Sequence, residues 1–528
     1  MTTQQAVAVS PKTLKAWVHD GKEIALLDVR EHGQYGEEHL FYVVSTPYSK
    51  LEVEVDRLVG RKDVRMVLVG DDAGDLSRKA CKRLADHGYT NLHYLDGGMA
   101  AWKAAGLEVF AGVNLPSKAF GELAEHAFDT PRITAQELNE KIKNKDDMVI
   151  LDGRPYTEYR KMSIPTAMCC PNGELPLRID DIVTSPDTTI VINCAGRTRS
   201  IIGAQTLINL GVKNKVLALE NGTQGWYLAD FALDHGATRR HPLAVDPAAA
   251  KQRQARARAL AEKHHVPFVR GEQVQRWLAE SGRTTFLCDV RTPEEFAQGS
   301  IPGAQHTPGG QLVQATDQYV GVRGARLVLF DNDGARAPAM ASWLAMLGWD
   351  VAVCEDALQH KWIPVAKANQ NATPVLEKLS ATELKTSLDK GAVLLDLRVS
   401  TKYREGHVRD AQWAIRPTLT MHAALKGKSV VLFVDDAAVA DLAALDVSEL
   451  GATKVQACLA TKEECTLAGL EWVATPAEPS DSQSIDYLFF VHDRHDGNKA
   501  AARQYLAWEM NLLAQIDEQE RSAFKLPH

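Results

Sequence analysis

The sequence predicts an α/β protein of four tandem domains, each a mostly parallel sheet with helices on both faces, followed by a C-terminal helical tail. Three observations lead to this prediction. The chain has 528 residues, which is enough for three or four domains of ordinary size. An apolar residue followed by Asp-x-Arg occurs four times. Around each copy, segments with helix periodicity alternate with short apolar strands.

The repeated motif sets the domain boundaries. Its four copies are Asp28 to Arg30, Asp152 to Arg154, Asp289 to Arg291 and Asp396 to Arg398. A helix-like segment precedes each copy, at residues 13–19, 134–143, 271–280 and 381–389. Apolar strands such as 66–69 and 327–330 follow. We therefore expect domains at 1–113, 131–236, 267–366 and 376–475, and a tail at 485–528.

Linkers are expected between these domains. Residues 116–131, 233–267 and 369–374 are candidates, with an exposed helix at 251–263 inside the second. In the tail, the sequence pattern at 488–497 predicts a further strand and a polar turn. The helix after it has an apolar face of Tyr505, Trp508, Leu512, Leu513 and Ile516. So apolar a face predicts docking on another domain, or on a second copy in a homodimer.

Composition excludes several classes of protein. There are 60 basic and 68 acidic residues, a balance that does not favour binding to nucleic acid or to a membrane surface. No basic leader and no apolar stretch of about 18 residues is present, so the expected location is cytoplasmic. The eight cysteines are scattered without a framework, which argues against disulfides and a zinc site. Neither a metal nor a cofactor is expected.

The best candidate for chemistry is Cys194. Three β-branched residues, 190–192, form a buried strand before it, and helix periodicity follows up to Gly211. The thiol is therefore expected where unpaired N–H groups and the positive end of a helix dipole favour a thiolate. The expected anion-binding loop comprises Ala195, Gly196, Arg197, Thr198, Arg199 and Ser200.

The other three repeats lack this nucleophile. Alignment on the glycine that ends each following helix places Asp71 and Asp331 opposite Cys194, and Asp435 opposite it with a gap of one residue. Carboxylates at these positions would repel an anion. We therefore interpret these three loops as parts of inactive scaffold domains.

An ordered set of motifs in the second repeat resembles the rhodanese family of sulfurtransferases. The similar segments are Cys-Ala-Gly-Arg-Thr-Arg-Ser at 194–200, Leu-Asp-Gly-Arg at 151–154, Glu158-Tyr159, Ser163-Ile164-Pro165, Glu220-Asn221-Gly222 and Trp226. The resemblance implies that Cys194 carries a persulfide. Sulfur would move from thiosulfate to cyanide or a thiol acceptor, and a protein is a further candidate acceptor.

The same resemblance implies roles for the residues around Cys194. Backbone N–H groups of 195–200 would stabilise the thiolate and the persulfide, and Arg197 and Arg199 would hold the departing dianion. Ser200 is expected to cap the helix.

Structural support is expected from Asp152, Arg154 and Glu158. In the family the Asp-x-Arg arginine pairs with an acidic residue four positions on. That residue is Glu158 or Glu295 in two repeats, whereas Gln34 and Lys402 replace it in the others.

Several alternatives remain open. The chain could be a multidomain persulfide carrier or a partner-binding scaffold rather than a turnover enzyme. A Cdc25-like phosphatase needs five residues between Cys and Arg, and only four separate Cys194 from Arg199. Mercaptopyruvate sulfurtransferases usually carry a loop without these arginines. Cys169 or Cys170 could relay sulfur, and His492 and His495 could approach the substrate.

Overall fold

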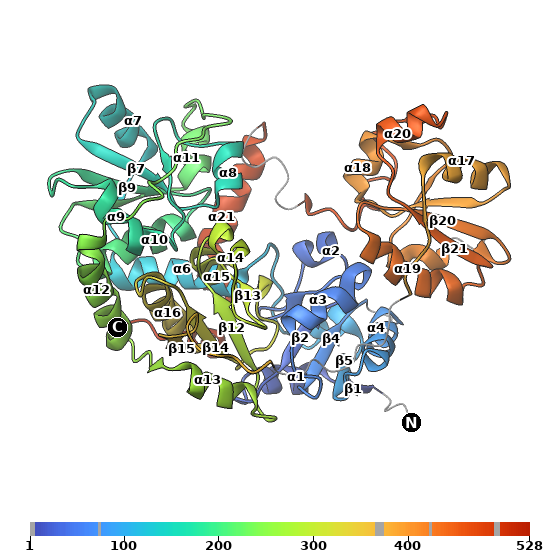
Figure 1. The fold of residues 1–528 in the computed structure, drawn as a ribbon, viewed down its shortest axis with the longest axis horizontal. Helices are drawn as coiled ribbons and strands as arrows, with labels where there is room; N and C mark the ends of the chain where they lie inside the picture. Colours follow the sequence, from blue (N-terminus) through green and yellow to red (C-terminus); the bar gives the residue numbers. More distant parts are fainter. Residues whose placement is uncertain (1–5, 72–74, 365–373, 422–424, 490–496, 528) are drawn as a thin grey trace. The chain divides into compact units, whose positions relative to one another are not determined.

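The described residues contain four parallel sheets, each with helices beside it (Figure 1). The computed structural model describes residues 6–71, 75–364, 374–421, 425–489 and 497–527. The chain divides into two compact units. One unit comprises residues 1–16, 24–112 and 368–490, and the other comprises residues 17–23, 113–367 and 491–528. Within the described residues, no helix is both long and apolar enough to cross a membrane.

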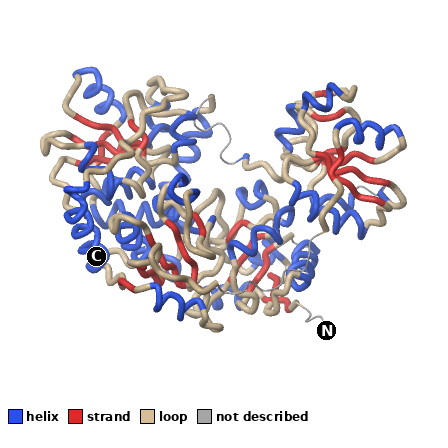
Figure 2. The backbone as a smooth tube through the Cα atoms, in the orientation of Figure 1, coloured by secondary structure: helices blue, strands red, loops and turns tan. Residues whose placement is uncertain are grey.

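The four large sheets share one strand order. In each sheet the first strand lies at one edge, followed by the fifth, fourth, second and third large-sheet strands of that repeat. The pairs are parallel, as in β7–β9, where Leu151 lies opposite Ile192 and Asp152 opposite Asn193. Parallel neighbours require crossover connections, and helices provide most of them (Figure 2). The predicted fold class is therefore confirmed.

The first and fourth repeats belong to the same unit. The first contains β1 (Val7–Val9), α1 (Pro11–Val18), β2 (Ala25–Asp28), α2 (His32–Glu37), β3 (Val44–Ser45), η1 (Tyr48–Lys50), α3 (Leu51–Leu58), β4 (Met66–Val69), α4 (Asp75–Asp86), β5 (Leu92–Leu95) and α5 (Gly98–Ala104). The fourth contains β16 (Lys378–Leu379), α17 (Ala381–Asp389), β17 (Val393–Asp396), α18 (Ser400–Glu405), β18 (His407–Val408), β19 (Gln412–Trp413), η4 (Arg416–Met421), β20 (Ser429–Phe433), α19 (Ala437–Glu449), β21 (Lys454–Cys458), α20 (Lys462–Leu467) and β22 (Trp472–Val473).

The second and third repeats form the core of the other unit. The second contains β6 (Arg132–Ile133), α7 (Ala135–Asn144), β7 (Met148–Asp152), α8 (Tyr156–Lys161), β8 (Met168–Cys169), α9 (Leu175–Ile182), β9 (Thr189–Asn193), α10 (Thr198–Asn209), β10 (Val216–Leu219) and α11 (Gly222–Leu228). The third contains β11 (Phe268–Val269), α13 (Gly271–Leu278), β12 (Thr285–Asp289), α14 (Pro293–Ala297), β13 (Gln305–His306), α15 (Gly309–Gln314), η3 (Thr316–Gln318), β14 (Arg326–Phe330), α16 (Arg336–Met346) and β15 (Asp350–Cys354).

The second repeat has a hydrophobic core on each face of its sheet. Successive strand residues point to opposite faces, so Ile150 belongs to one core and Leu151 to the other. Helices α7 and α11 cover the first core with Leu138 and Trp226. Helices α9 and α10 cover the second, and Leu207 is among their buried residues. Cys194 follows the central strand β9, so it lies at the carboxyl end of the parallel strands between the two cores.

The Asp-x-Arg motif forms the same ion pair in all four repeats. In the second repeat, Arg154 donates to both carboxylate oxygens of Asp152, at 2.9 and 2.7 Å, and to the carbonyl of Met162. The equivalent pairs in the other repeats are Arg30–Asp28, Arg291–Asp289 and Arg398–Asp396. The expected pairing with the acid four positions on is therefore wrong. The partner is the aspartate two positions before, so Gln34 and Lys402 do not disturb the motif.

Two of the expected linkers contain packed helices. Residues 116–131 fall largely in α6 (Leu115–Phe128), which buries Phe120 and contacts α10. The second linker contains η2 (Pro247–Ala249) and α12 (Ala250–Lys263). Helix α12 was expected to be exposed, but it buries Ala257 and Leu260 against Leu210 and Ala335. Tertiary contact, which a linker's composition does not reveal, explains both differences.

The tail helix docks within the second unit. Helix α21 (Lys499–Gln515) contacts α6 and α11, and the short α22 (Glu518–Arg521) follows it (Figure 1). Tyr505, Leu512 and Ile516 of its expected apolar face are buried, whereas Trp508 and Leu513 are half-buried. Of the strand expected at 488–497, residues 490–496 lie outside the described residues, and 488–489 are not in a strand.

Candidate functional site

Cys194 lies immediately after β9 and four residues before α10 begins at Thr198. Its side chain is buried, with an exposed fraction of 2%. The Ser200 hydroxyl donates to the Cys194 Sγ over 3.2 Å. Ser200 was expected to cap the helix, but it lies inside α10, and its hydroxyl contacts the nucleophile instead.

The loop after Cys194 is held by the start of α11. The N–H of Thr223 donates to the carbonyl of Cys194 over 2.8 Å, and that of Gln224 to the carbonyl of Ala195 over 3.0 Å. A Cβ on Gly222 would lie 2.2 Å from the Cys194 carbonyl oxygen, and the φ of Gly222 is +51°. Only glycine allows this close approach without strain. These bonds turn the loop carbonyls toward α11.

Asp152 and Arg154 support the strand end that carries Cys194. The Asn193 side chain donates to Asp152 over 3.0 Å, and the N–H of Gly153 donates to the Asn193 carbonyl over 2.9 Å. Asp152 and Asn193 are fully buried. The two motif residues therefore act through Asn193, and we assign them a positioning role.

A cavity of about 330 Å³ opens beside Cys194. The second repeat contributes Glu158, the loop residues 194–199 and Gln224 to its lining. Other segments of the same unit supply Val113, Asn114, Lys118, Gln311, Gln314, Ala315, Gln318, Tyr505 and Glu509. Alignment of the repeats could not find most of these residues, because they lie in the supposed linker, in the third repeat and in the tail.

Arg197 does not point an unpaired charge into the cavity. Its guanidinium bonds both oxygens of Glu122 at 2.7 and 2.8 Å, and it also pairs with Glu125. Both acids lie on α6. Burial raises the pKa of Glu122 to about 7, although the bond from Arg197 opposes this shift. The expectation that Arg197 holds a dianion therefore needs revision, because carboxylates already balance its charge.

Among the described residues, Arg199 has one carboxylate as a hydrogen-bond partner. Its two terminal nitrogens donate to the two oxygens of Glu158, each over 2.8 Å. One of them also donates to the amide oxygen of Gln311 over 3.1 Å. Gln311 belongs to α15 of the third repeat. Glu158, expected to pair with Arg154, thus orients an arginine of the cysteine loop.

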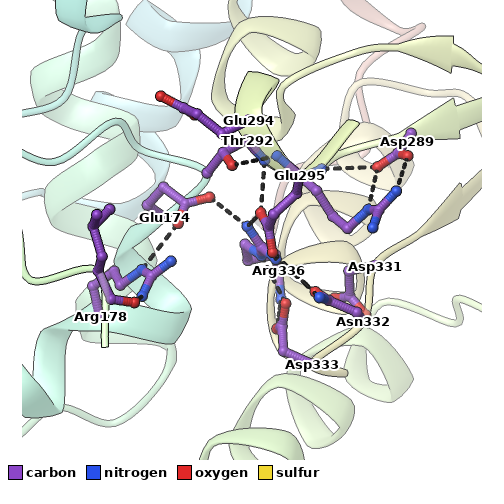
Figure 3. A network of polar contacts seen from close by, with 12 residues as sticks. Glu174, Arg178, Asp289, Thr292, Glu294, Glu295, Asp331, Asn332, Asp333 and Arg336 are labelled. Atoms are coloured by element: carbon purple, nitrogen blue, oxygen red, sulfur yellow. Dashed lines mark hydrogen bonds and ion pairs between the residues drawn. The ribbon is translucent and has the colours of Figure 1, made fainter. Parts of the chain in front are cut away.

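The third repeat contains an equivalent arginine that is surrounded by more carboxylates. Arg336 is equivalent to Arg199, and it pairs with Glu295, the counterpart of Glu158, at 2.7 and 2.9 Å (Figure 3). It also pairs with Asp333 of its own loop and with Glu174 of the second repeat. Glu174 is equivalent to Gln311, since each lies five residues after the last residue of its strand, β8 or β13. The two repeats therefore face each other with matching residues, but three acids surround Arg336.

The register of the two sheets fixes this equivalence. Asp152 lies opposite Cys169 in the second repeat, and Asp289 lies opposite His306 in the third. Glu174 and Gln311 each follow those partners by five residues, so they occupy the same place in the two repeats. Arg199 thus meets a neutral amide where Arg336 meets a carboxylate.

In the third repeat, the Asp331 carboxylate occupies the position of the cysteine and accepts hydrogen bonds from N–H groups of the loop. Asp331, which replaces the cysteine, accepts the N–H of Gly334 over 2.8 Å and that of Ala337 over 2.7 Å. Burial, together with the nearby Asp333, raises the pKa of Asp331 to about 7. The first and fourth repeats differ again: Asp71 accepts the N–H of Leu76, and Asp435 pairs with Lys402. Each of these three loops therefore has an aspartate where the second repeat has Cys194.

The two further cysteines near the site belong to the hydrophobic cores. Cys169 and Cys170 are fully buried, one in each core of the second repeat. Burial raises the pKa of Cys169 to about 12 and that of Cys170 well above its usual range. Such thiols are poor nucleophiles, which does not favour a relay. His492 and His495 lie outside the described residues.

The described part of the chain contains no group of three or more His, Cys, Asp or Glu side chains arranged to hold a metal ion.

Comparison with protein-family models matches the rhodanese-like domain at residues 10–105, 134–229 and 271–359. The chain belongs to the rhodanese family. Within this rhodanese, the matched segments are the first three repeats, and the fourth shares their strand order. The resemblance noted in the sequence is thereby confirmed.

Solved and curated relatives of this rhodanese extend the comparison. A thiosulfate sulfurtransferase from Pseudomonas aeruginosa is 36% identical and has a TM-score of 0.89, with 98% of this chain and 99% of that chain covered. A candidate sulfur carrier, YrkF, from Bacillus subtilis is 26% identical over 28% of this chain and 86% of its own. An uncharacterised Synechocystis protein, slr1261, is 30% identical over 22% of this chain and 62% of its own.

Proposed function

We propose that this rhodanese is a sulfurtransferase that moves a sulfane sulfur through a persulfide on Cys194. The observation that carries the proposal is the position of Cys194 at the base of a polar cavity, with the Ser200 hydroxyl donating to its Sγ. The aspartates at the matching positions of the other repeats cannot form a persulfide. The likeness to the Pseudomonas aeruginosa thiosulfate sulfurtransferase over nearly the whole chain supports the same function.

The reaction has two steps. In the first, the Cys194 thiolate attacks the outer sulfur of thiosulfate, the S–S bond of thiosulfate breaks, and sulfite leaves with the electron pair. In the second, a thiol or cyanide attacks the outer sulfur of the persulfide, and Cys194 recovers its thiolate. The Ser200 hydroxyl donates a hydrogen bond to the sulfur at rest, and a donor in this place stabilises negative charge on the sulfur. The N–H of Ser200 itself is bonded to the Arg197 carbonyl.

Thiosulfate is the proposed donor because of the charge on one side of the cavity. Arg199 lines this side of the cavity, and its hydrogen-bond partners there are the carboxylate of Glu158 and the neutral amide of Gln311. The two terminal nitrogens of Arg199 bond Glu158, and the remaining N–H donors of the guanidinium suit the oxygens of a sulfonate group. Arg197, by contrast, is balanced by two acids of α6, and we assign it to positioning the loop.

The test is a mass measurement on the full chain and on its Cys194→Ala variant, each incubated with thiosulfate and then with cyanide. We expect a gain of one sulfur atom only in the wild-type protein, lost on addition of cyanide as thiocyanate. Absence of the adduct from wild-type protein would refute thiosulfate as donor. An adduct that persists in the variant would refute Cys194 as the carrier.

A persulfide carrier is the second candidate, and the partial likeness to the Bacillus subtilis protein favours it. A carrier would transfer its sulfur once to a specific protein acceptor, whereas an enzyme would release thiocyanate repeatedly. Counting thiocyanate molecules per protein molecule separates the two. More than one turnover supports the enzyme, and the burial of Cys194 under a small cavity leads us to expect that result.

A further inference from the structure

Two buried polar side chains in the cavity have unpartnered atoms. Among the described residues, no hydrogen-bond partner is assigned to the Oε2 atom of Glu509 or to either amide atom of Gln224. The two side chains are 1% and 0% exposed. An unpartnered polar group is costly when buried, and a charged one more so. Neither residue is used by the reaction steps described above.

Both groups face the loop that carries Cys194. A Cβ built on Gly196 would lie 3.1 Å from the Glu509 Oε2 and 3.4 Å from the Gln224 Nε2. The other oxygen of Glu509 is fixed, because it accepts from the Thr198 hydroxyl over 3.0 Å and from the Lys118 ammonium over 3.2 Å. Glu509 and Gln224 both line the cavity. The Oε2 atom of Glu509 is therefore held in place beside the loop that follows Cys194.

The set of unpartnered atoms indicates the chemistry of a ligand. Glu509 Oε2 and Gln224 Oε1 are acceptors, and one of them carries negative charge. A primary ammonium has three N–H donors and a positive charge, so it can satisfy both acceptors at once. The Gln224 Nε2 donor is left for an acceptor atom elsewhere on the same ligand.

The charge around the cavity favours a cation at the second step. Three basic side chains, Lys118, Arg197 and Arg199, are paired with four acids: Glu122, Glu125, Glu158 and Glu509. The persulfide adds a further negative charge. A cationic acceptor would therefore be attracted to the loaded enzyme, whereas an anionic one would be repelled.

We propose that Glu509 and Gln224 bind the ammonium group of the sulfur acceptor, and that this acceptor is a thiol of amino-acid size carrying a primary amine. The proposal rests on the sulfurtransferase function proposed above. The acceptor thiolate attacks the outer persulfide sulfur and forms a new S–S bond. The bond between that sulfur and Sγ breaks, and Sγ keeps the electron pair, so the products are an amino-persulfide and the Cys194 thiolate.

The test compares three small thiols that differ in charge: cysteamine, 2-mercaptoethanol and mercaptoacetate. Each reacts with the thiosulfate-loaded full chain at equal concentrations of thiolate, so that differences in thiol acidity cancel. We expect the order cysteamine, 2-mercaptoethanol, mercaptoacetate in kcat/KM. The Glu509→Gln variant should lose about tenfold in kcat/KM for cysteamine and change about twofold or less for 2-mercaptoethanol. The charged hydrogen bond to the acceptor is lost for cysteamine alone, whereas the loss of the ion pair with Lys118 affects both thiols alike.

Glu518→Gln is the matched control, since it removes an exposed carboxylate from the same tail. It should leave all three rates unchanged. Equal rates for the three thiols, or an equal loss for cysteamine and 2-mercaptoethanol in Glu509→Gln, would overturn the proposal. The mass of the loaded protein is measured first, so a failure to form the persulfide is seen as a failure of the proposed function and not of the acceptor assignment.

Discussion

Arg197 and Arg199 lie two residues apart, but the structure gives them different surroundings. Arg197 contacts two glutamates of α6, and Arg199 contacts one glutamate and one glutamine. Their identity and their nearness to Cys194 were evident from the sequence. Their partners were not, because Glu122, Glu125 and Gln311 come from segments outside the second repeat. A charge can be read from a sequence, but its balance depends on tertiary contacts.

Glu122 should make donor binding depend on pH. Its pKa is raised to about 7, chiefly by burial, so the carboxyl becomes protonated as the pH falls through neutrality. Arg197 then loses one of its two negative partners, and the cavity becomes more positive. In the Cys194→Ala background, which removes the thiol, we expect thiosulfate to bind several-fold more tightly at about pH 6 than at about pH 8. Titration calorimetry measures the two dissociation constants.

The added variant Glu122→Gln should flatten that pH dependence and bind as the protonated form does at both pH values. Glu140→Gln removes an exposed carboxylate from α7 and should leave the dependence in place. Tighter binding at the higher pH, or an unchanged dependence in Glu122→Gln, would show that another group titrates.

Among the elements, those of the repeat were predicted well and those between repeats were not. The strand expected at 66–69 is β4, and the helix expected at 381–389 is α17. Apolar periodicity reports burial against the sheet of the same repeat, so it identifies these elements. Helix α6 was taken for a linker, because its role depends on contacts with α10 and α21 that are distant in the sequence.

Helix α15 offers a direct test of charge in the site. Gln311 bonds Arg199 in the same way as Glu174 bonds Arg336. The substitution Gln311→Glu therefore gives Arg199 a second carboxylate. The side chain keeps its size. We expect the rate of persulfide formation at low thiosulfate to fall about tenfold, because a carboxylate on Arg199 competes with the donor. Stopped-flow or quenched mass measurement follows the reaction.

The mirrored change, Glu174→Gln, is the control. It removes a carboxylate from Arg336, which keeps Glu295 and Asp333, and Glu174 does not line the cavity. Persulfide formation should stay at the wild-type rate. A similar loss in both variants would mean that the contact between the repeats, and not the charge on Arg199, controls the rate.

At the scale of the whole molecule, four copies of one topology have taken different roles. The repeated Asp–Arg pair is present in all four, as expected for a scaffold feature. The cysteine loop was identified from the sequence because one copy differed from the others. The cavity was not, since its lining combines the second and third repeats with α6 and α21. The repeated sequence pattern therefore predicts the fold of each repeat. The site, in contrast, depends on contacts between the second and third repeats and the helices α6 and α21.

Of the residues that the structure describes, none from the unit of the first and fourth repeats lines this cavity. That unit's own buried ion network gives a test of this separation. Arg416 is 1% exposed and pairs with Glu52 and Asp446. Replacing it by Met leaves the buried Glu52 without this partner, whereas Asp446 keeps Lys79 and Arg83. We expect this unit to lose about 3–5 kcal/mol of stability. Below the unfolding transition, persulfide formation on Cys194 should keep its wild-type rate.

Calorimetry and mass measurement on the same Arg416→Met sample check both expectations. Arg409→Met is the matched control, because Arg409 and its partner Glu471 are both more than half exposed and a pair of that kind adds little to stability. A lower transition temperature in Arg416→Met alone, with an unchanged rate of persulfide formation, is the expected result. The hydrogen bonds given for Arg416 join it to Asp446, Tyr48 and Glu52, none of which lines the cavity. A slower rate at a temperature where the variant is fully folded would therefore show that the first and fourth repeats influence persulfide formation.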